Sequence, residues 1–192
     1  MSAALRSWLE VALDWRRPEA ERISAIVRLG EFGDPSVVLP LGLLYSESGG
    51  RLRSVTAESL DRLSAVEVLA RLLRSEDGEQ RLRAVQAMGA LGAPTALPSL
   101  LLALSDPVAK VREFAASALL TLRDDRALPE LVRSLSQDPD PDVRGAAAQA
   151  LGELDRPEAQ EALERAAALE PDPFTVILIE RSLYRFTERA AA

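Results

Sequence analysis

The chain has 192 residues and a formal net charge of −7, and it contains neither cysteine nor histidine. Disulfides, thiolate nucleophiles, zinc sites built from cysteine or histidine and histidine-based triads are therefore excluded. Hydrophobic residues make up 47% of the chain but aromatic residues only 4%, which favours closely packed helices over a β-sandwich.

The first predicted element is an amphipathic helix within residues 1–17. Its apolar face carries Leu5, Trp8, Leu9, Ala12 and Leu13. Glu10 and Asp14 interrupt the apolar residues, so the segment does not have the pattern of a signal peptide. We expect this helix to cap the first repeat, because a single repeat cannot bury both of its faces.

Five repeats follow, and each is predicted to form two antiparallel helices. They cover residues 19–46, 50–75, 78–105, 106–136 and 138–169. The first helix of each repeat carries an arginine at its second position, and the intervals between these arginines are 31, 28, 31 and 32 residues. The column consists of Arg22, Arg53, Arg81, Arg112 and Arg144. Self-similarity at such a period is the signature of a stacked repeat architecture.

Turn signals separate the predicted helices. Asp106-Pro107 precedes the first helix of the fourth repeat, where the aspartate supplies an N-cap oxygen and the proline is preset for helix entry. Residues 172–188 are predicted to form a degenerate terminal helix, in which Val176 stands at the position of the arginine.

Two motifs carry a resemblance to a known family. Residues 106–119 read D-P-x-x-x-V-R-x-x-A-x-x-A-L, and residues 96–100 and 127–131 both read A-L-P-x-L. These motifs resemble HEAT repeats, specifically the short bacterial type similar to phycobilin-lyase HEAT-like repeats, and the resemblance covers residues 19–186. It implies an all-α, right-handed α-α superhelix of about five antiparallel helix pairs with capping helices, in a single domain over residues 1–192. Because one fold serves many functions, the resemblance is less specific for function.

The arginine column has two interpretations. One is a row of anion-binding side chains. The other, which we favour, is a structural ladder in which each arginine reaches acids or carbonyl groups in the loops of a neighbouring repeat. Arg112 lies six residues after Asp106, and Arg144 lies six after Asp138. The planar guanidinium group suits such forked contacts.

The second helices of such solenoids usually line the concave, partner-binding face. Their register is set on four leucines that we expect to be buried: Leu72, Leu100, Leu131 and Leu163. This register predicts an outward row of partner-binding residues: Arg71, Arg74, Ser99, Leu102, Glu130, Arg133 and Arg165. Arginines around an exposed leucine are typical of interface hot spots, although a solvated helix face is an equally simple interpretation.

These features lead us to expect a non-enzymatic scaffold or adaptor, which binds a protein partner through its concave face. An acidic surface on that partner would suit the arginine row. Acidic pairs such as Asp124-Asp125 lie in turns and are interpreted as helix caps, so no catalytic residue, metal site or cofactor is expected. Since no apolar run approaches the roughly 20 residues of a membrane span, we expect a cytoplasmic protein without membrane insertion.

Two alternative functions stay open. A bilin lyase or a lyase-chaperone subunit is implied by the repeat resemblance alone. A HEAT-like nucleic-acid-binding protein is the second alternative, but a net charge of −7 is not typical of that class, and no nucleic acid is expected as a partner. The oligomeric state is left open by the sequence.

Overall fold

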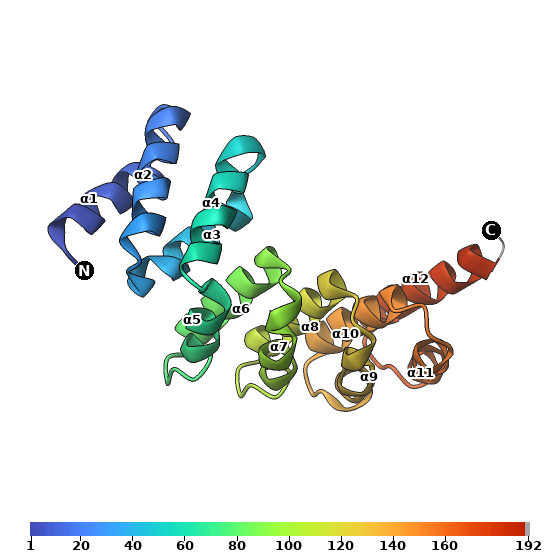
Figure 1. Ribbon diagram of the computed structural model, residues 1–192. Helices are drawn as coiled ribbons and strands as arrows, with labels where there is room; N and C mark the ends of the chain where they lie inside the picture. Colours follow the sequence, from blue (N-terminus) through green and yellow to red (C-terminus); the bar gives the residue numbers. More distant parts are fainter. Residues whose placement is uncertain (191–192) are drawn as a thin grey trace. The chain divides into compact units, whose positions relative to one another are not determined.

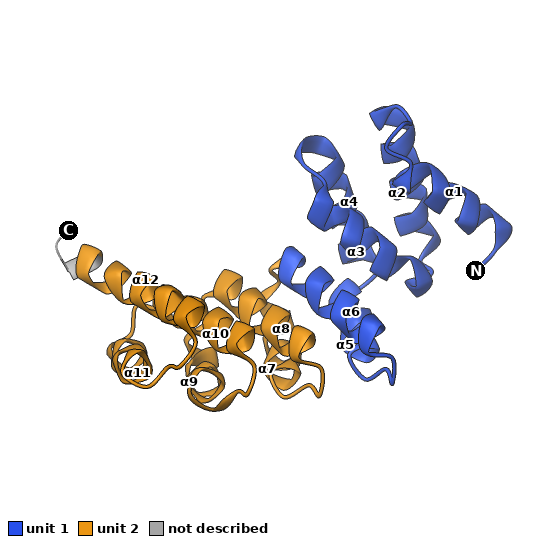
Figure 2. Ribbon diagram, turned by 180° about the vertical axis from the view of Figure 1, so that it is seen from behind, with its two compact units in different colours: residues 1–91 blue, residues 92–192 orange. Residues whose placement is uncertain are grey.

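The computed structural model of the protein describes residues 1–190, and over this range it contains twelve α-helices and no strand (Figure 1). The all-α fold class is therefore confirmed. The chain divides into two compact units, unit 1 over residues 1–91 and unit 2 over residues 92–192 (Figure 2). The single domain expected from the sequence stays a prediction.

The helices follow the order expected from the repeats. Helix α1 (Ala3–Leu13) comes first, and α12 (Pro173–Ala190) comes last. Between them, in chain order, lie α2 (Glu19–Phe32) and α3 (Val38–Glu47), α4 (Gly50–Arg62) and α5 (Ala65–Leu72), α6 (Gly78–Leu91) and α7 (Leu97–Ala103), α8 (Ala109–Leu122) and α9 (Leu128–Gln137), and α10 (Pro141–Glu153) and α11 (Pro157–Ala167). Short 3-10 helices lead into α3, α7 and α9, over Pro35–Val37, Pro94–Ala96 and Asp125–Ala127.

Unit 2 is a regular two-layered stack. Helices α8, α10 and α12 pack side by side in one layer, while α7, α9 and α11 lie along the other (Figures 1 and 2). The core between the layers is aliphatic, and its fully buried side chains include Val111, Leu131, Val143, Leu151 and Leu163. Burying one leucine side chain stabilises the fold by about 2 kcal/mol, so these buried side chains stabilise the stack.

Small residues let neighbouring first helices approach closely. A Cβ atom added to Gly152 of α10 would lie 2.8 Å from Cβ of Ser182 in α12. The same distance, 2.8 Å, would separate a Cβ atom added to Gly30 of α2 from Cβ of Ser59 in α4. Both glycines hold the same position in their repeats, so this contact between first helices recurs in the two units.

Unit 1 departs from this regular stacking. Helix α2 packs on α1 and α4, but α6 packs on α3 rather than chiefly on α4. A Cβ atom added to Gly42 of α3 would lie 2.7 Å from Cβ of Ala87 in α6. Only Leu63 and Ser64 separate α4 from α5, no 3-10 helix intervenes, and Ser64 has a φ of 48°. The second repeat is therefore shortened in the turn between its two helices.

This shortened turn corrects the register predicted for α5. The buried leucines of the other second helices, including Leu100, Leu131 and Leu163, are 0% exposed, but Leu72 is half-buried and Leu69 is the leucine of α5 with 0% exposure. A buried alanine, Ala65, stands four residues before Leu69, as Ala96 stands four before Leu100. The prediction for Leu72 was wrong because it carried the spacing of the longer repeats across the shorter turn.

Candidate functional site

Two arginines of the column each join a pair of loops in unit 2. Arg144 donates from Nε and Nη2 to the two carboxylate oxygens of Glu170, over 2.8 and 2.6 Å, and its Nη1 donates to the carbonyl oxygen of Asp138 over 3.0 Å. Arg112 donates in the same way to the carboxylate of Asp138, over 2.7 Å for both bonds, and to the carbonyl oxygen of Asp106 over 2.9 Å. Each guanidinium group therefore bridges the loop before its helix and the loop of the next repeat.

The acid partner differs from the one expected from the sequence. The residue six positions before the arginine supplies a carbonyl oxygen, whereas the carboxylate belongs to the residue 26 positions after it. Arg81 also contacts the carbonyl oxygen six positions before it, since its Nη1 donates to the carbonyl oxygen of Ser75 over 2.9 Å. Use of the column as a structural ladder stays a prediction.

The remaining two arginines of the column, both in unit 1, make different contacts. Nε of Arg22 donates to the carbonyl oxygen of Ala12 in α1 over 3.0 Å. The guanidinium carbon of Arg53 lies 4.4 Å from the ring centroid of Tyr45, in a cation–π contact. The column is thus regular in sequence but not in its contacts.

The ion pairs of unit 2 are shielded from solvent. The side chains of Arg144 and Glu170 are 13% and 3% exposed. Hydrogen bonds from Arg144 hold the pKa of Glu170 below its usual value, although burial acts in the opposite direction. Burial also acts to raise the pKa of Asp138, but hydrogen bonds from Arg112 and from the backbone N–H of Asp140 outweigh it, so that the pKa is lowered. These carboxylates are therefore held in their charged form.

The partner-binding residues predicted in unit 2 lie on α7, α9 and α11. Leu102 is 76% exposed, and Arg133 and Arg165 are also exposed, while Ser99 and Glu130 are half-buried. Arg133 pairs with Glu130 over 2.6 Å, and its Nη2 lies 3.0 Å from Oγ of Ser105. The second helices of unit 2 therefore expose arginines and one leucine on a common face, while their leucines at the register positions point inward.

The two predicted residues of unit 1 are Arg71 and Arg74, and both are exposed. Arg71 lies two residues after the buried Leu69, as Leu102 lies two after Leu100. Arg74 lies beyond Leu72, the last residue of α5. With the corrected register, Arg71 takes the repeat position that had been given to Arg74.

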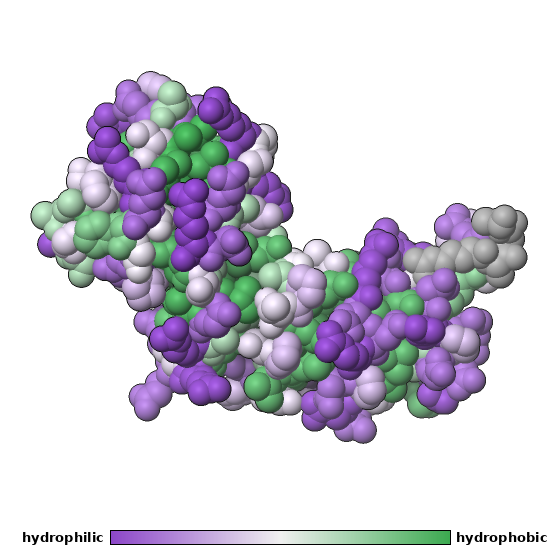
Figure 3. Space-filling model, in the orientation of Figure 1, coloured by the Kyte–Doolittle hydropathy of each residue, from purple (hydrophilic) through white to green (hydrophobic). Residues whose placement is uncertain are grey.

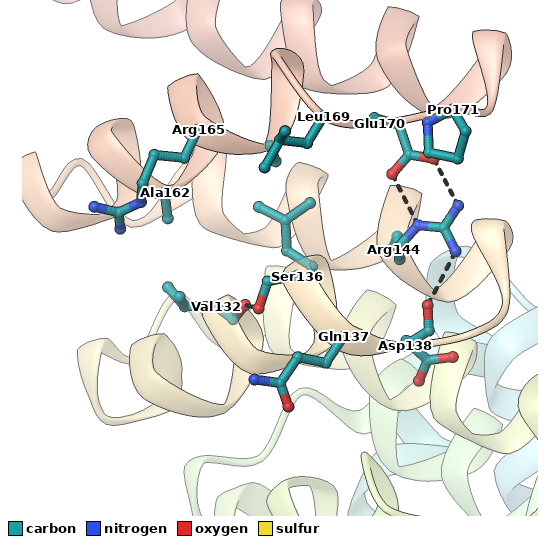
Figure 4. Close-up of a pocket in the computed structure, with 12 residues that line it drawn as sticks. Val132, Ser136, Gln137, Asp138, Arg144, Ala162, Arg165, Leu169, Glu170 and Pro171 are labelled. Atoms are coloured by element: carbon teal, nitrogen blue, oxygen red, sulfur yellow. Dashed lines mark hydrogen bonds and ion pairs between the residues drawn. The ribbon is translucent and has the colours of Figure 1, made fainter.

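A groove of about 490 Å³ runs between α9 and α11 (Figure 4). Its apolar lining consists of Val132, Leu135, Ala162, Ala166, Leu169 and Pro171. Arg165 and Gln137 add polar groups to the lining, and the ion pair of Arg144 with Glu170 lies at one end. Leu169, just past α11, is 83% exposed. The sequence interpretation missed this leucine because it treated the segment as the end of a repeat, although an isolated leucine after three alanines was a usable signal.

Among the described residues, no three His, Cys, Asp or Glu side chains are grouped so that they could hold a metal ion. Asp124 accepts a hydrogen bond from the backbone N–H of Arg126 over 3.0 Å and so caps a 3-10 helix. Within that part of the chain, no helix is both long and apolar enough to cross a bilayer.

The stacked helix pairs and the groove between second helices define a helical-repeat solenoid. A family model for HEAT repeats matches residues 52–119 and 97–183. The chain belongs to the HEAT-repeat family, which confirms the resemblance carried by its motifs.

Known relatives and structures resemble this chain to different extents. Deoxyhypusine hydroxylase of Drosophila melanogaster is 30% identical over 112 residues, which are 56% of this chain and 37% of the relative. The structure of human deoxyhypusine hydroxylase in complex with glycerol has a TM-score of 0.56 at 24% identity and covers 96% of this chain and 74% of its own. The structure of Kap121p bound to Nup53p has a TM-score of 0.64 at 13% identity and covers 97% of this chain and 25% of its own.

At these identities the two structures show the fold alone. The chain spans 37% of the fly relative's length, so the activity of the whole fly protein is a proposal for this chain.

The expectation of a non-enzymatic protein is contradicted by these similarities. Both the fly relative and the human structure carry the name of a hydroxylase, which is an enzyme. The sequence interpretation excluded catalysis from residue types and turn positions, and such reasoning does not see kinship with an enzyme. Nothing in these similarities concerns a bilin or a nucleic acid. The bilin-lyase and nucleic-acid-binding alternatives therefore stay predictions, and so does a cytoplasmic location.

Proposed function

We propose that the chain binds a segment of a partner protein on the second-helix surface of unit 2. This surface is defined by Leu102, Val132, Arg133, Arg165 and Leu169. The observation that carries the proposal is the groove of about 490 Å³ between α9 and α11, beside a leucine that is 83% exposed. Leu102, Arg133 and Arg165 were assigned to the concave face from the sequence, whereas Val132 and Leu169 are added by the lining of the groove.

The chemistry of the surface suits a protein segment. Large apolar side chains left in water beside a concave lining are typical of interaction sites, and arginine is enriched at the hot spots of interfaces. Arg165 has only one ion-pair partner among the described residues, Glu161 at 3.9 Å, and its side chain is 68% exposed. An apolar side chain of the partner would fill the groove, while a carboxylate beside it would pair with Arg165.

The architecture supports the same proposal. Helical-repeat proteins use extended surfaces of stacked second helices to bind their partners. Kap121p, which shares the fold, is seen bound to Nup53p. Arg71 holds the equivalent repeat position in unit 1, and we propose that it serves the same kind of surface there, with Arg74 beside it.

Affinity purification with altered surfaces tests the proposal. The variant Arg165→Glu/Leu169→Asp should lose the proteins that co-purify with the unaltered chain. A matched control, Arg181→Glu/Phe174→Asp, changes one exposed arginine and one exposed aromatic residue on α12, and should retain them. Equal recovery with both variants would place the binding site elsewhere.

A second candidate is catalysis of the kind named for the fly relative, because 112 residues of this chain are 30% identical to that protein. On this proposal the chain takes part in hydroxylating a deoxyhypusine residue. The test is to incubate the purified chain in air, with metal ions and a reductant, together with a protein that carries deoxyhypusine, so that dioxygen supplies the added oxygen atom and its second oxygen atom is reduced to water. Mass spectrometry would then detect an added oxygen atom, and an unchanged substrate mass would count against this candidate.

A further inference from the structure

Two neighbouring second helices of unit 2 place an arginine at the same repeat position in different surroundings. Arg133 of α9 and Arg165 of α11 each lie two residues after a leucine that is 0% exposed. The residue just before that leucine is Glu130 in α9 and Ala162 in α11. Glu130 pairs with Arg133 over 2.6 Å, whereas an alanine offers Arg165 no such partner. Helix α9 therefore neutralises its arginine from this position, and α11 does not.

Arg133 is also tied to the preceding repeat. Its Nη2 donates to Oγ of Ser105, just after α7, over 3.0 Å. Ser136 of α9 holds the equivalent position, five residues after the buried leucine, but its Oγ donates to the carbonyl oxygen of Val132 over 2.9 Å. Within the described part of the chain, no hydrogen bond joins Ser136 to Arg165. Arg165 is therefore not fixed across the groove between α9 and α11.

The ion pair that Arg165 does make is weak. Its partner is Glu161, at 3.9 Å, and both side chains are 68% exposed. Solvent screens such exposed pairs, so that they stabilise a fold little. A carboxylate of a partner can therefore take the place of Glu161 at Arg165 with little loss.

The opposite end of the groove carries charges that are already compensated (Figure 4). The other charged residues of the lining are Asp138, Arg144 and Glu170. Arg144 binds Glu170, and Asp138 is bound by Arg112, in forked pairs whose side chains are all 13% exposed or less. Arg165 is therefore the charged group of the lining that can attract an anion.

An apolar stretch lies between the two ends. Val132 and Leu135 line it on α9, and Ala162 and Ala166 line it on α11, with the exposed Leu169 beside them. The two alanines leave room on the α11 side for a large apolar side chain. The same residue, Ala162, thus contributes to the space in the groove and leaves Arg165 without the partner that Arg133 has.

We propose that Arg165 makes this groove selective for a segment in which an aspartate or glutamate accompanies a large apolar residue. The inference rests on the proposed function, since it names the class of segment that the second-helix surface of unit 2 would bind. The apolar side chain fills the space beside Ala162 and Leu169, and the acid pairs with Arg165. Arg133 adds little selectivity for charge, because Glu130 already satisfies it.

The probe is a random-peptide library displayed on phage and selected on the immobilised full chain. The enriched peptides should share a large apolar residue and an aspartate or glutamate at a constant spacing from it. Selection on Arg165→Glu should keep the apolar residue but replace the acid by lysine or arginine. Arg181→Glu, which reverses the charge of an exposed arginine on α12 outside the groove, should return the same motif as the unaltered chain.

A double-mutant cycle then tests the contact itself. One enriched peptide is labelled with fluorescein, and its binding is measured by fluorescence anisotropy. Replacing its acid by the matching amide should weaken binding to the unaltered chain about fivefold or more, because a charge-assisted hydrogen bond is lost. The same replacement should have little effect on binding to Arg165→Gln, since the partner of the carboxylate is absent there. Arg165→Gln should keep the melting temperature of the unaltered chain, because the side chain is exposed.

Failure of this inference can be told apart from failure of the proposed function. If no peptide is enriched, or if the enriched peptides bind Arg165→Glu/Leu169→Asp as well as the unaltered chain, both are contradicted. Peptides that lose binding with Leu169→Asp but carry no acid would overturn the selectivity alone. So would an acid whose replacement weakens binding equally with and without Arg165.

Discussion

At the residue scale, the shielded pair of Arg144 and Glu170 has a testable energetic consequence. Glu170→Gln removes the charge from a side chain that is 3% exposed and leaves the guanidinium group without its anion. We expect the free energy of unfolding at pH 7 to fall by about 2 kcal/mol, since hydrogen bonds to charged groups are worth about that much. Urea denaturation measures it, and Glu180→Gln, at an exposed position, should stay within about 0.5 kcal/mol of the unaltered chain.

The same pair predicts how stability depends on pH. Because the folded-state pKa of Glu170 is lowered, chiefly by its hydrogen bonds with Arg144, the pair stabilises the fold above the unfolded-state pKa of about 4.3. That contribution is lost as the pH falls through the lower, folded-state pKa. The difference in stability between the unaltered chain and Glu170→Gln should therefore shrink as the pH falls below about 4. A difference that stays constant from pH 7 to pH 3 would contradict this account.

The arginine column shows what a residue pattern can and cannot predict. Its recurrence was visible because the repeats align, and the carbonyl contacts of Arg112 and Arg144 lie only six residues away. The carboxylates lie 26 residues away, and only the packing of one repeat on the next brings them into reach. Arg22 instead donates to a carbonyl oxygen of α1, a helix that precedes the repeats, and an aligned column of repeat positions does not display such a contact.

At the scale of helices, the contact between α10 and α12 depends on a glycine. Gly152→Ala would place Cβ 2.8 Å from Cβ of Ser182. Although alanine has the higher helix propensity, we expect a net loss of about 1 to 3 kcal/mol from overpacking. Thermal unfolding followed by circular dichroism measures the loss. Adding Ser182→Gly should restore part of the stability, and a Gly152→Ala variant that is more stable than the unaltered chain would contradict the close contact.

The register of α5 gives a second prediction at this scale. Leu69 is fully buried and Leu72 is half-buried. Leu69→Ala should therefore cost about 2 to 4 kcal/mol, and Leu72→Ala clearly less, because a cavity forms only where the site is enclosed. Chemical denaturation of the two variants provides the comparison. A larger loss of stability for Leu72→Ala than for Leu69→Ala would instead support the register inferred from the repeat spacing.

The helices themselves were largely predictable, and the turn of the second repeat was not. Apolar residues at helical spacing and proline or glycine at the boundaries mark the helix pairs in the sequence. The interval of 28 residues between Arg53 and Arg81 shows that three residues are missing relative to the neighbouring intervals of 31. It does not show where they are missing. The positive φ of Ser64 and the burial of Leu69 place the deletion between α4 and α5.

At the scale of the whole molecule, composition and repeats were sufficient to predict an all-α solenoid. The sites were harder to predict because each draws on several elements. The groove of unit 2 takes its lining from α9, α10 and α11 and from the loops that follow α9 and α11. The similarity to a hydroxylase emerged only from comparison with a relative's sequence, over 56% of this chain and 37% of that relative.

The central claim is that the second-helix surface of unit 2 binds a protein segment, and site-specific photocrosslinking tests it most directly. A photoreactive residue at Leu169, beside the groove, should crosslink to a discrete partner in cells, and Arg165→Glu should reduce that crosslink. The same residue at Phe174, on α12 and outside the lining of the groove, should yield no such product. A crosslink from Phe174 with none from Leu169 would contradict the account.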